Sequence, residues 1–159
     1  MKISRHQWYL INIVSLHMVN KNFLIKDIHD YELLFKKIEF NPGSRTIIYL
    51  KGDLGSGKTT FVQKYLTEKY KFIETSSPTF GIINTYSIRE TKVYHYDLYR
   101  IIRPSELDDI GFYENLAIDT LHFIEWPEII PKQVYRPDIT ITFQLLSNER
   151  LLSLNIVDE

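Results

Sequence analysis

At residues 52–59 the chain reads Gly52-Asp53-Leu54-Gly55-Ser56-Gly57-Lys58-Thr59, which matches the phosphate-binding loop pattern at every fixed position. The glycines let backbone N–H groups curl around an anion, and Lys58 can reach the outer phosphates of a nucleotide. The hydroxyl of Thr59 can ligate Mg²⁺. This loop, extended by Thr60, is therefore the candidate site for the phosphates of a nucleoside triphosphate.

The sequence on either side places this loop between a strand and a helix. Upstream, residues 46–50 form a short β-branched and apolar run of the kind that becomes a buried strand. Downstream, residues 60–70 follow a helical period, with an apolar face of Phe61, Val62, Tyr65 and Leu66. A helix N-terminus favours an anion because its first N–H groups are unsatisfied and its dipole is positive there.

Length and composition favour one globular domain spanning residues 1–159. Of the 159 residues, 44% are hydrophobic and 25% are charged, which is enough apolar mass for one core. The formal net charge of -1 argues against a broad basic surface that coats nucleic acid. The absence of cysteine excludes disulfides and thiolate metal sites, and it is compatible with the cytoplasm.

The N-terminus imitates a secretory signal, since Lys2 and Arg5 precede the apolar run 8–14. No small-residue cleavage site follows, and the run is too short to span a bilayer. We therefore predict no membrane association and assign residues 1–20 to an N-terminal extension of the domain.

A helix is expected between this extension and the loop strand. Asp27 or Asp30 can cap it, and it runs to about Phe40. Its apolar face consists of Ile28, Leu34, Phe35 and Ile38.

Downstream of the loop helix, the pattern predicts two hairpins, two short helices and one buried strand. The ranges are 81–88 with 92–99 for the first hairpin, 105–111 and 113–118 for the helices, 121–125 for the strand, and 139–145 with 151–157 for the second hairpin. Two hairpins exclude a wholly parallel sheet. We predict a three-layer α/β fold resembling P-loop NTPases, with a mixed sheet that is parallel around the loop strand and antiparallel at the edges.

A phosphate-binding loop also needs a carboxylate, because Mg²⁺ is anchored by an acidic residue at the end of a neighbouring strand. Asp97 and Glu125 each end an apolar run. One can hold the metal while the other orients or activates water, and strand logic leaves the assignment open. Thr79, in the loop after the helix, can sense the terminal phosphate. His95 fits a hydrogen-bonded strand histidine better than a proton carrier.

Five segments appear in the order and approximate spacing of the bacterial TsaE (YjeE) family, over about residues 23–157. They are Gly52-Asp53-Leu54-Gly55-Ser56-Gly57-Lys58-Thr59-Thr60-Phe61, Ser77-Pro78-Thr79-Phe80, Tyr86, His95-Tyr96-Asp97-Leu98-Tyr99-Arg100 and Ile124-Glu125-Trp126-Pro127-Glu128. Many enzymes share the first segment. The Asp-Leu-Tyr-Arg and Glu-Trp-Pro-Glu segments together are specific to this family.

The resemblance implies a small Mg²⁺-dependent ATPase needed for threonylcarbamoylation of the adenosine next to the anticodon in tRNAs that read codons beginning with A. In that family the ATPase docks on the TsaB–TsaD pair and supports its turnover, and we expect it to meet tRNA indirectly or through that complex. TsaC or its relative makes the threonylcarbamoyl-adenylate separately. We expect slow hydrolysis without partners, and a monomer or weak oligomer when the protein is free.

The resemblance also implies residue roles. Lys58 binds phosphates, Thr59 and Glu125 hold Mg²⁺, and Asp97 is a catalytic or nucleotide-sensing carboxylate. Trp126 lies beside the metal site, and Thr79 falls in the first switch-like loop.

Two positions depart from the family pattern. Tyr31 stands where the family commonly has a threonine near the nucleotide, and Arg150 stands alone where the family often has paired arginines. Arg150 is kept as a candidate nucleotide contact.

Two other functions remain open. A small-molecule kinase can use Arg100 and Arg103 to bind an acceptor phosphate, although no lid insertion is evident. A nucleotide-sensing assembly module would bind ATP, with hydrolysis secondary to assembly.

Overall fold

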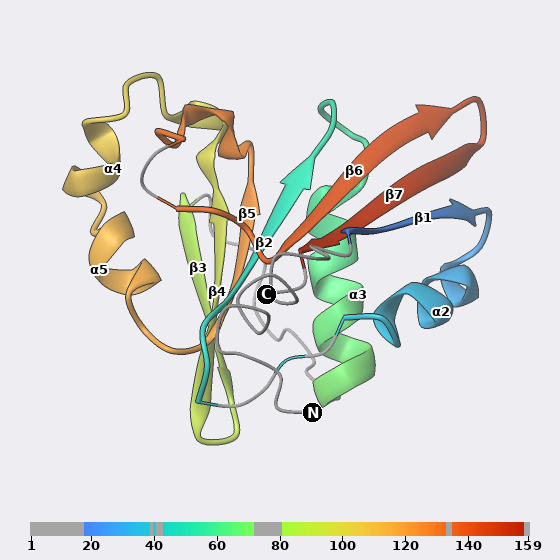
Figure 1. The fold of residues 1–159 in the computed structure, drawn as a ribbon, viewed down its shortest axis with the longest axis horizontal. Helices are drawn as coiled ribbons and strands as arrows, with labels where there is room; N and C mark the ends of the chain where they lie inside the picture. Colours follow the sequence, from blue (N-terminus) through green and yellow to red (C-terminus); the bar gives the residue numbers. More distant parts are fainter. Residues whose placement is uncertain (1–17, 39, 41–42, 72–80, 133–134, 158–159) are drawn as a thin grey trace, which may run out of the picture.

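The computed structural model describes residues 18–38, 40, 43–71, 81–132 and 135–157, which form one mixed sheet covered by helices. The strands are β1 (Met18–Ile25), β2 (Thr46–Lys51), β3 (Ile83–Ile88), β4 (Thr91–Asp97), β5 (Leu121–Glu125), β6 (Ile139–Leu146) and β7 (Glu149–Val157). Their order across the seven-stranded sheet is β1-β7-β6-β2-β5-β4-β3 (Figure 1). Strands β6, β2, β5 and β4 are parallel, and both edges pair antiparallel. The predicted mixed sheet is confirmed.

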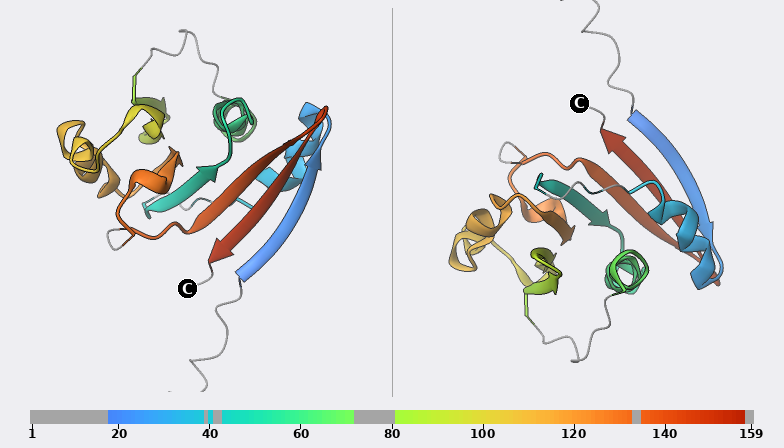
Figure 2. Two further views of the ribbon diagram at one scale, coloured as in Figure 1. Left: turned by 90° about the horizontal axis from the view of Figure 1, so that it is seen from above. Right: turned by 90° about the horizontal axis from the view of Figure 1, so that it is seen from below.

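Helices cover both faces of this sheet, as the three-layer prediction requires (Figure 2). The α-helices are α2 (Tyr31–Phe35), α3 (Lys58–Tyr70), α4 (Glu106–Asp109) and α5 (Phe112–Leu116), and the 3₁₀ helices are η1 (Ile28–Asp30), η2 (Leu98–Arg100) and η3 (Pro127–Ile129). Side chains of α2 and α3 pack on one face of the sheet, and those of α4 and α5 pack on the other. In the described part of the chain, no helix combines the length and apolar character needed to cross a membrane.

Alternate residues of the central strands face opposite helical layers, because successive side chains of a strand point to opposite faces. On β2, Ile48 and Leu50 belong to the core beneath α2 and α3, whereas Ile47 and Tyr49 belong to the core beneath α4 and α5. On β5, Phe123 packs edge-on against Phe61 of α3, with ring centroids 6.4 Å apart. This contact sets where the first turns of α3 lie over the sheet.

The edge strand β1 was not predicted from the sequence. It pairs with β7 over its whole length, from Met18 opposite Val157 to Ile25 opposite Arg150. Residues 18–20, which we assigned to the extension, therefore belong to the sheet, while residues 1–17 lie outside the described residues. The pattern missed the strand because Asn20, Lys21 and Asn22 have low β-propensity.

The predicted helix running to about Phe40 is wrong in length, since α2 ends at Phe35. It begins with the 3₁₀ turn η1, which Asp27 caps by accepting a hydrogen bond from the His29 N–H group. A 3₁₀ turn has about 3.0 residues per turn, so it shifts the phase of the apolar face. Ile28 is consequently exposed, and Tyr31 is buried in the core.

Beyond the first hairpin, α4 and α5 occupy the two predicted helical ranges but are shorter than expected. Ser105 precedes α4 without making a side-chain cap hydrogen bond. The second hairpin, β6 with β7, lies where the sequence predicts it.

His122 is buried on the face of β5 that packs against α4 and α5. Its ring stacks on Tyr94 and Tyr96, with centroids 5.4 Å and 6.0 Å away. Burial lowers the pKa of His122 below its ordinary value of 6.5; the positive charge of Arg45 lowers it further, and the hydrogen bond to the Ile118 carbonyl opposes the shift. The folded protein therefore holds this histidine neutral.

We predict that His122 makes the fold sensitive to acid. Because its pKa is lower in the folded state, the unfolded chain binds the proton more tightly. The neutral ring therefore contributes stability above about pH 6.5, and this contribution is lost as the pH falls through the folded-state pKa. Urea unfolding at about pH 7.5 and about pH 5.5 measures the loss.

The His122→Gln variant, which does not titrate, should lose less free energy of unfolding between these two pH values than the wild type. The exposed His29 offers the matched control, because His29→Gln should keep the full pH dependence. If His122→Gln lost as much free energy of unfolding between the two pH values as the wild type does, the assignment to His122 would be contradicted.

Candidate functional site

The glycine-rich loop joins the end of β2 to the start of α3, as predicted. Gly52, Gly55 and Gly57 have φ angles of 142°, 77° and 103°, which side chains rarely tolerate. A Cβ added to Gly52 would lie 2.5 Å from the Phe143 carbonyl oxygen of β6. A Cβ on Gly57 would lie 3.0 Å from Nε of Arg150. The backbone of β6 and the side chain of Arg150 therefore pack directly against this loop.

Lys58 lies buried beneath the loop. Its Nζ donates hydrogen bonds to the carbonyl oxygens of Gly52 at 2.6 Å and Asp53 at 2.9 Å. The same atom lies 4.2 Å from the ring centre of Trp126, within the range of a cation–π contact. Burial lowers the pKa of Lys58, and nearby carboxylates, Glu125 foremost, oppose that shift. The ammonium group is thus held inside the loop by neutral acceptors and an aromatic face.

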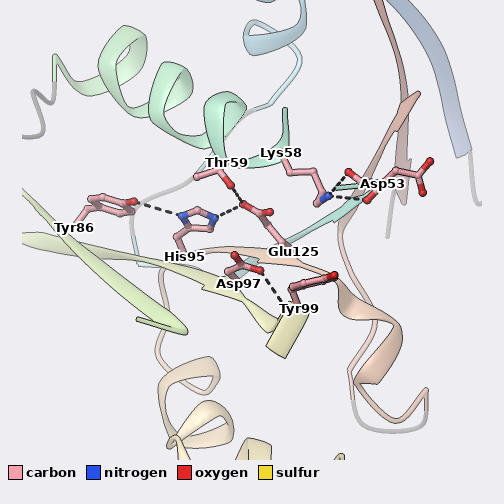
Figure 3. A network of polar contacts seen from close by, with 9 residues as sticks. Asp53, Lys58, Thr59, Tyr86, His95, Asp97, Tyr99 and Glu125 are labelled. Carbon is pink, nitrogen blue, oxygen red and sulfur yellow. Dashed lines mark hydrogen bonds and ion pairs between the residues drawn. The ribbon is translucent and has the colours of Figure 1, made fainter. Parts of the chain in front are cut away.

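Thr59 and Glu125 are in direct contact. Thr59 lies in the first turn of α3 and donates its hydroxyl hydrogen to Glu125 Oε1 at 2.7 Å, and Glu125 ends β5 (Figure 3). A second hydrogen bond of 2.8 Å links the same oxygen, Oε1 of Glu125, to Nε2 of His95. Glu125 and His95 are both buried. The structure therefore confirms the predicted hydrogen-bonded strand histidine.

Asp97 ends the neighbouring strand β4 and lies opposite Glu125 in the parallel register. One of its oxygens, Oδ1, accepts a hydrogen bond from the Tyr99 N–H group at 3.2 Å and so caps η2. The two carboxylates chosen from strand ends are therefore neighbours. Asp97 also performs the capping role expected of a purely structural aspartate.

A cavity of about 200 Å³ brings most of the candidate residues together. Its lining consists of Leu54, Gly55, Gly57, Lys58, Thr59, Thr60, Asp97, Glu125, Trp126 and Arg150. Asp53 contributes its carbonyl oxygen to Lys58 rather than a side chain to the lining. Thr79 lies outside the described residues.

Ser56 and Arg150 complete the loop. The Ser56 carbonyl accepts a hydrogen bond from Nε of Arg150 at 3.1 Å, which ties the β6–β7 hairpin to the loop. The Ser56 hydroxyl is buried and has no hydrogen-bond partner among the described residues. An unpartnered buried hydroxyl is costly, so this atom is suited to a polar ligand in the loop.

The donor set also suits a magnesium–nucleotide complex. Mg²⁺ is usually held by one or two protein oxygens together with substrate phosphates, rather than by a full protein cage. Thr59 and Glu125 supply such oxygens. Among the described residues, no cluster of three or more His, Cys, Asp or Glu side chains that could hold a metal ion is present.

Tyr86 is one of the residues that carry the family resemblance, but the sequence assigned it no role in the site. Its hydroxyl lies 3.4 Å from Nδ1 of His95, on the far side of the ring from Glu125 (Figure 3). The two residues belong to paired strands, with Asn84 opposite His95. Only the register of that hairpin, which the sequence did not specify, brings Tyr86 to the histidine.

The strand–loop–helix unit and the acidic end of the adjacent parallel strand define a P-loop-type α/β protein. The family model described as threonylcarbamoyl adenosine biosynthesis protein TsaE matches residues 25–152. The chain belongs to the TsaE family of tRNA threonylcarbamoyladenosine biosynthesis proteins, as the sequence resemblance indicates.

Individual relatives agree with this assignment. The tRNA threonylcarbamoyladenosine biosynthesis protein TsaE of Rickettsia prowazekii is 34% identical over 142 residues, which cover 88% of this chain and 94% of that protein. The Rickettsia conorii protein of the same name is 40% identical over 109 residues, which cover 67% of this chain but 61% of that protein. The crystal structure of Bacillus subtilis YdiB shares the fold, with a TM-score of 0.66 and 21% identity over 91% of this chain and 90% of that one.

We predict that Gly52→Ala costs more stability than Gly55→Ala. Both substitutions strain a positive φ, which costs about 1–2 kcal/mol. Only Gly52→Ala also drives a Cβ into the backbone of β6, and such overpacking adds about 1–3 kcal/mol. A Cβ on Gly55 meets nothing within 4 Å, so that variant is the matched control. Urea unfolding measures both, and equal losses would refute the close approach of β6.

Proposed function

We propose that this protein is a Mg²⁺-dependent ATPase of the cytoplasm that supports threonylcarbamoylation of the adenosine next to the anticodon in tRNAs reading codons beginning with A. It acts with the TsaB–TsaD complex, which performs the transfer, and hydrolyses ATP slowly without its partners. The observation that carries this proposal is the hydrogen bond from Thr59 to the buried Glu125, beside the buried Lys58, at the mouth of a glycine loop.

The loop binds the phosphates. Lys58 already donates two hydrogen bonds to loop carbonyls, and phosphate oxygens are stronger acceptors because they are charged. The N-terminus of α3 adds its unsatisfied N–H groups and positive dipole. The cavity of about 200 Å³ suits the phosphate chain, with the nucleoside extending beyond it.

Thr59 and Glu125 would hold Mg²⁺, which supplies charge neutralisation on the phosphates during transfer to water. Glu125 is the better metal residue because it contacts Thr59, whereas Asp97 contacts the backbone at Tyr99. Asp97 still lines the cavity, and we assign it to orienting the attacking water or sensing the nucleotide.

Trp126 and Arg150 flank the phosphates in this proposal. Trp126 has a positive φ of 58° and packs against Tyr99, with ring centroids 4.9 Å apart. Arg150 approaches from the β6–β7 hairpin. Tyr31 does not line the cavity, and its ring is buried against Phe35 and Phe61.

A kinase is less well supported. Arg103, one of its two candidate acceptor residues, pairs with Glu106 at 3.3 Å. Neither Arg100 nor Arg103 lines the cavity.

Reconstituted tRNA modification with TsaB, TsaD, a source of threonylcarbamoyl-adenylate and this protein tests the proposal. We predict that Glu125→Ala and Asp97→Ala each abolish multiple-turnover modification and slow ATP hydrolysis by about 100-fold, the usual cost of removing one group that stabilises or orients the reaction. Glu114→Ala, on the exposed surface of α5, should behave as wild type.

Other outcomes identify the alternatives. Normal tRNA modification with Glu125→Ala or with Asp97→Ala would show that the substituted residue does not have the role assigned to it. Full modification with a non-hydrolysable ATP analogue would indicate a nucleotide-sensing module instead, and phosphorylation of a metabolite would indicate a kinase.

We also predict that MgATP stabilises the wild type through Lys58. A ligand at 100 times its Kd raises the free energy of unfolding by about 2.7 kcal/mol. Lys58→Ala should lose this increment, whereas Lys69→Ala, at an exposed position on the same helix, should keep it. Thermal melting with and without MgATP provides the measurement, and an unchanged increment in Lys58→Ala would count against phosphate binding by this residue.

A further inference from the structure

A buried chain of hydrogen bonds crosses the sheet behind the candidate metal residues. Tyr86 on β3 contacts Nδ1 of His95 on β4 at 3.4 Å, and His95 Nε2 contacts Glu125 on β5 at 2.8 Å (Figure 3). Thr59 on α3 reaches the same Glu125 oxygen at 2.7 Å. Three strands and the loop helix are thus joined at one carboxylate.

The direction of these bonds follows from their chemistry. An ionised carboxylate only accepts hydrogen bonds, so Nε2 of His95 carries the hydrogen it shares with Glu125. In the neutral ring Nδ1 is then an acceptor, and the hydroxyl of Tyr86 donates to it. Tyr86 thereby selects the tautomer that points a donor at Glu125.

Both donors end on Oε1 of Glu125. Together they orient the plane of the carboxylate, while Glu125 lines the cavity. The two hydrogen bonds to Oε1 come from different elements, since Thr59 belongs to the loop helix and His95 to the sheet. A rearrangement of the loop around phosphates would alter the hydrogen bond from Thr59 and leave the one from His95 in place.

A second tyrosine–histidine pair shows that burial alone does not explain this arrangement. The Tyr96 hydroxyl lies 3.3 Å from Nδ1 of His122, whose Nε2 lies 2.9 Å from the Ile118 carbonyl. That pair lies on the opposite face of the sheet, and its histidine contacts a backbone carbonyl instead of a carboxylate. Of the two buried histidines in the described part of the chain, only His95 has its Nε2 atom at a carboxylate of the cavity.

We propose that His95 is a positioning residue that holds the Glu125 carboxylate ready for the magnesium–nucleotide complex, with Tyr86 fixing the histidine ring. This inference rests on the proposed function. A residue that orients a metal-binding group from behind typically changes metal affinity by about 10- to 100-fold when it is replaced.

Calorimetric titration of ADP and ATP, with and without Mg²⁺, tests this role in the full chain. His95→Phe should reduce the Mg²⁺-dependent gain in nucleotide affinity by about 10- to 100-fold and leave the Mg²⁺-free affinity near the wild-type value. His95→Gln can place an amide N–H group near the position of Nε2 and should restore most of the gain. Tyr86→Phe should have a smaller effect in the same direction.

His122→Phe is the matched control, because it removes an equally buried histidine from the other face. It should lower the stability of the protein and leave the Mg²⁺-dependent gain unchanged. An undiminished gain in a folded His95→Phe protein overturns the positioning role alone. A wild type that shows no Mg²⁺-dependent gain overturns the proposed function itself.

Nitrogen NMR of the histidine rings in the free wild type adds a test that needs no variant. The positioning role requires Nε2 of His95 to carry a hydrogen, because that nitrogen faces the Glu125 carboxylate. A ring protonated on Nδ1 and bare on Nε2 would overturn it, whatever the binding data show.

Discussion

The hydrogen bond from Thr59 to Glu125 joins the first turn of the loop helix to the end of a central strand, and the rest of the site depends on it. A second contact between the same two elements, Phe61 against Phe123, lies in the core beneath α2 and α3. Two attachments prevent α3 from sliding along β5 or rotating on it. Core packing on this face of the sheet therefore positions Lys58 and the loop as well as stabilising the fold.

Because side chains alternate along β4 and β5, the residues of the site lie on one face of the sheet and a purely structural cluster lies on the other. His95 and Glu125 face α3 and take part in the site, while His122, on the other face, hydrogen-bonds a backbone carbonyl among stacked tyrosines. A one-residue slip between the strands would exchange these faces. Because both faces are buried against helices, the core specifies the register that brings Asp97 beside Glu125.

The sequence predicted the centre of the fold better than its edge, for physical reasons. The loop, β2 and β5 have strong local patterns, and the carboxyl ends of parallel strands meet at one edge of a sheet, so Glu125 and Asp97 could be found from sequence alone. The strand β1 could not, because its polar residues are held by pairing with β7 rather than by β-propensity. The contact of Tyr86 with His95 depends on hairpin register, which local patterning did not reveal.

If the protein binds ATP as proposed, the charges around the cavity make a divalent cation favourable beside the nucleotide. Lys58 and Arg150 line it together with Asp97 and Glu125, so the formal charges of these four side chains cancel. A triphosphate brings several negative charges into this lining, where the helix dipole and loop N–H groups supply only partial positive charge. The two carboxylates would repel the phosphates unless a cation stood between them. Mg²⁺ held by Glu125 and Thr59 would offset that repulsion, and Lys58 could then exchange its carbonyl partners for phosphate oxygens.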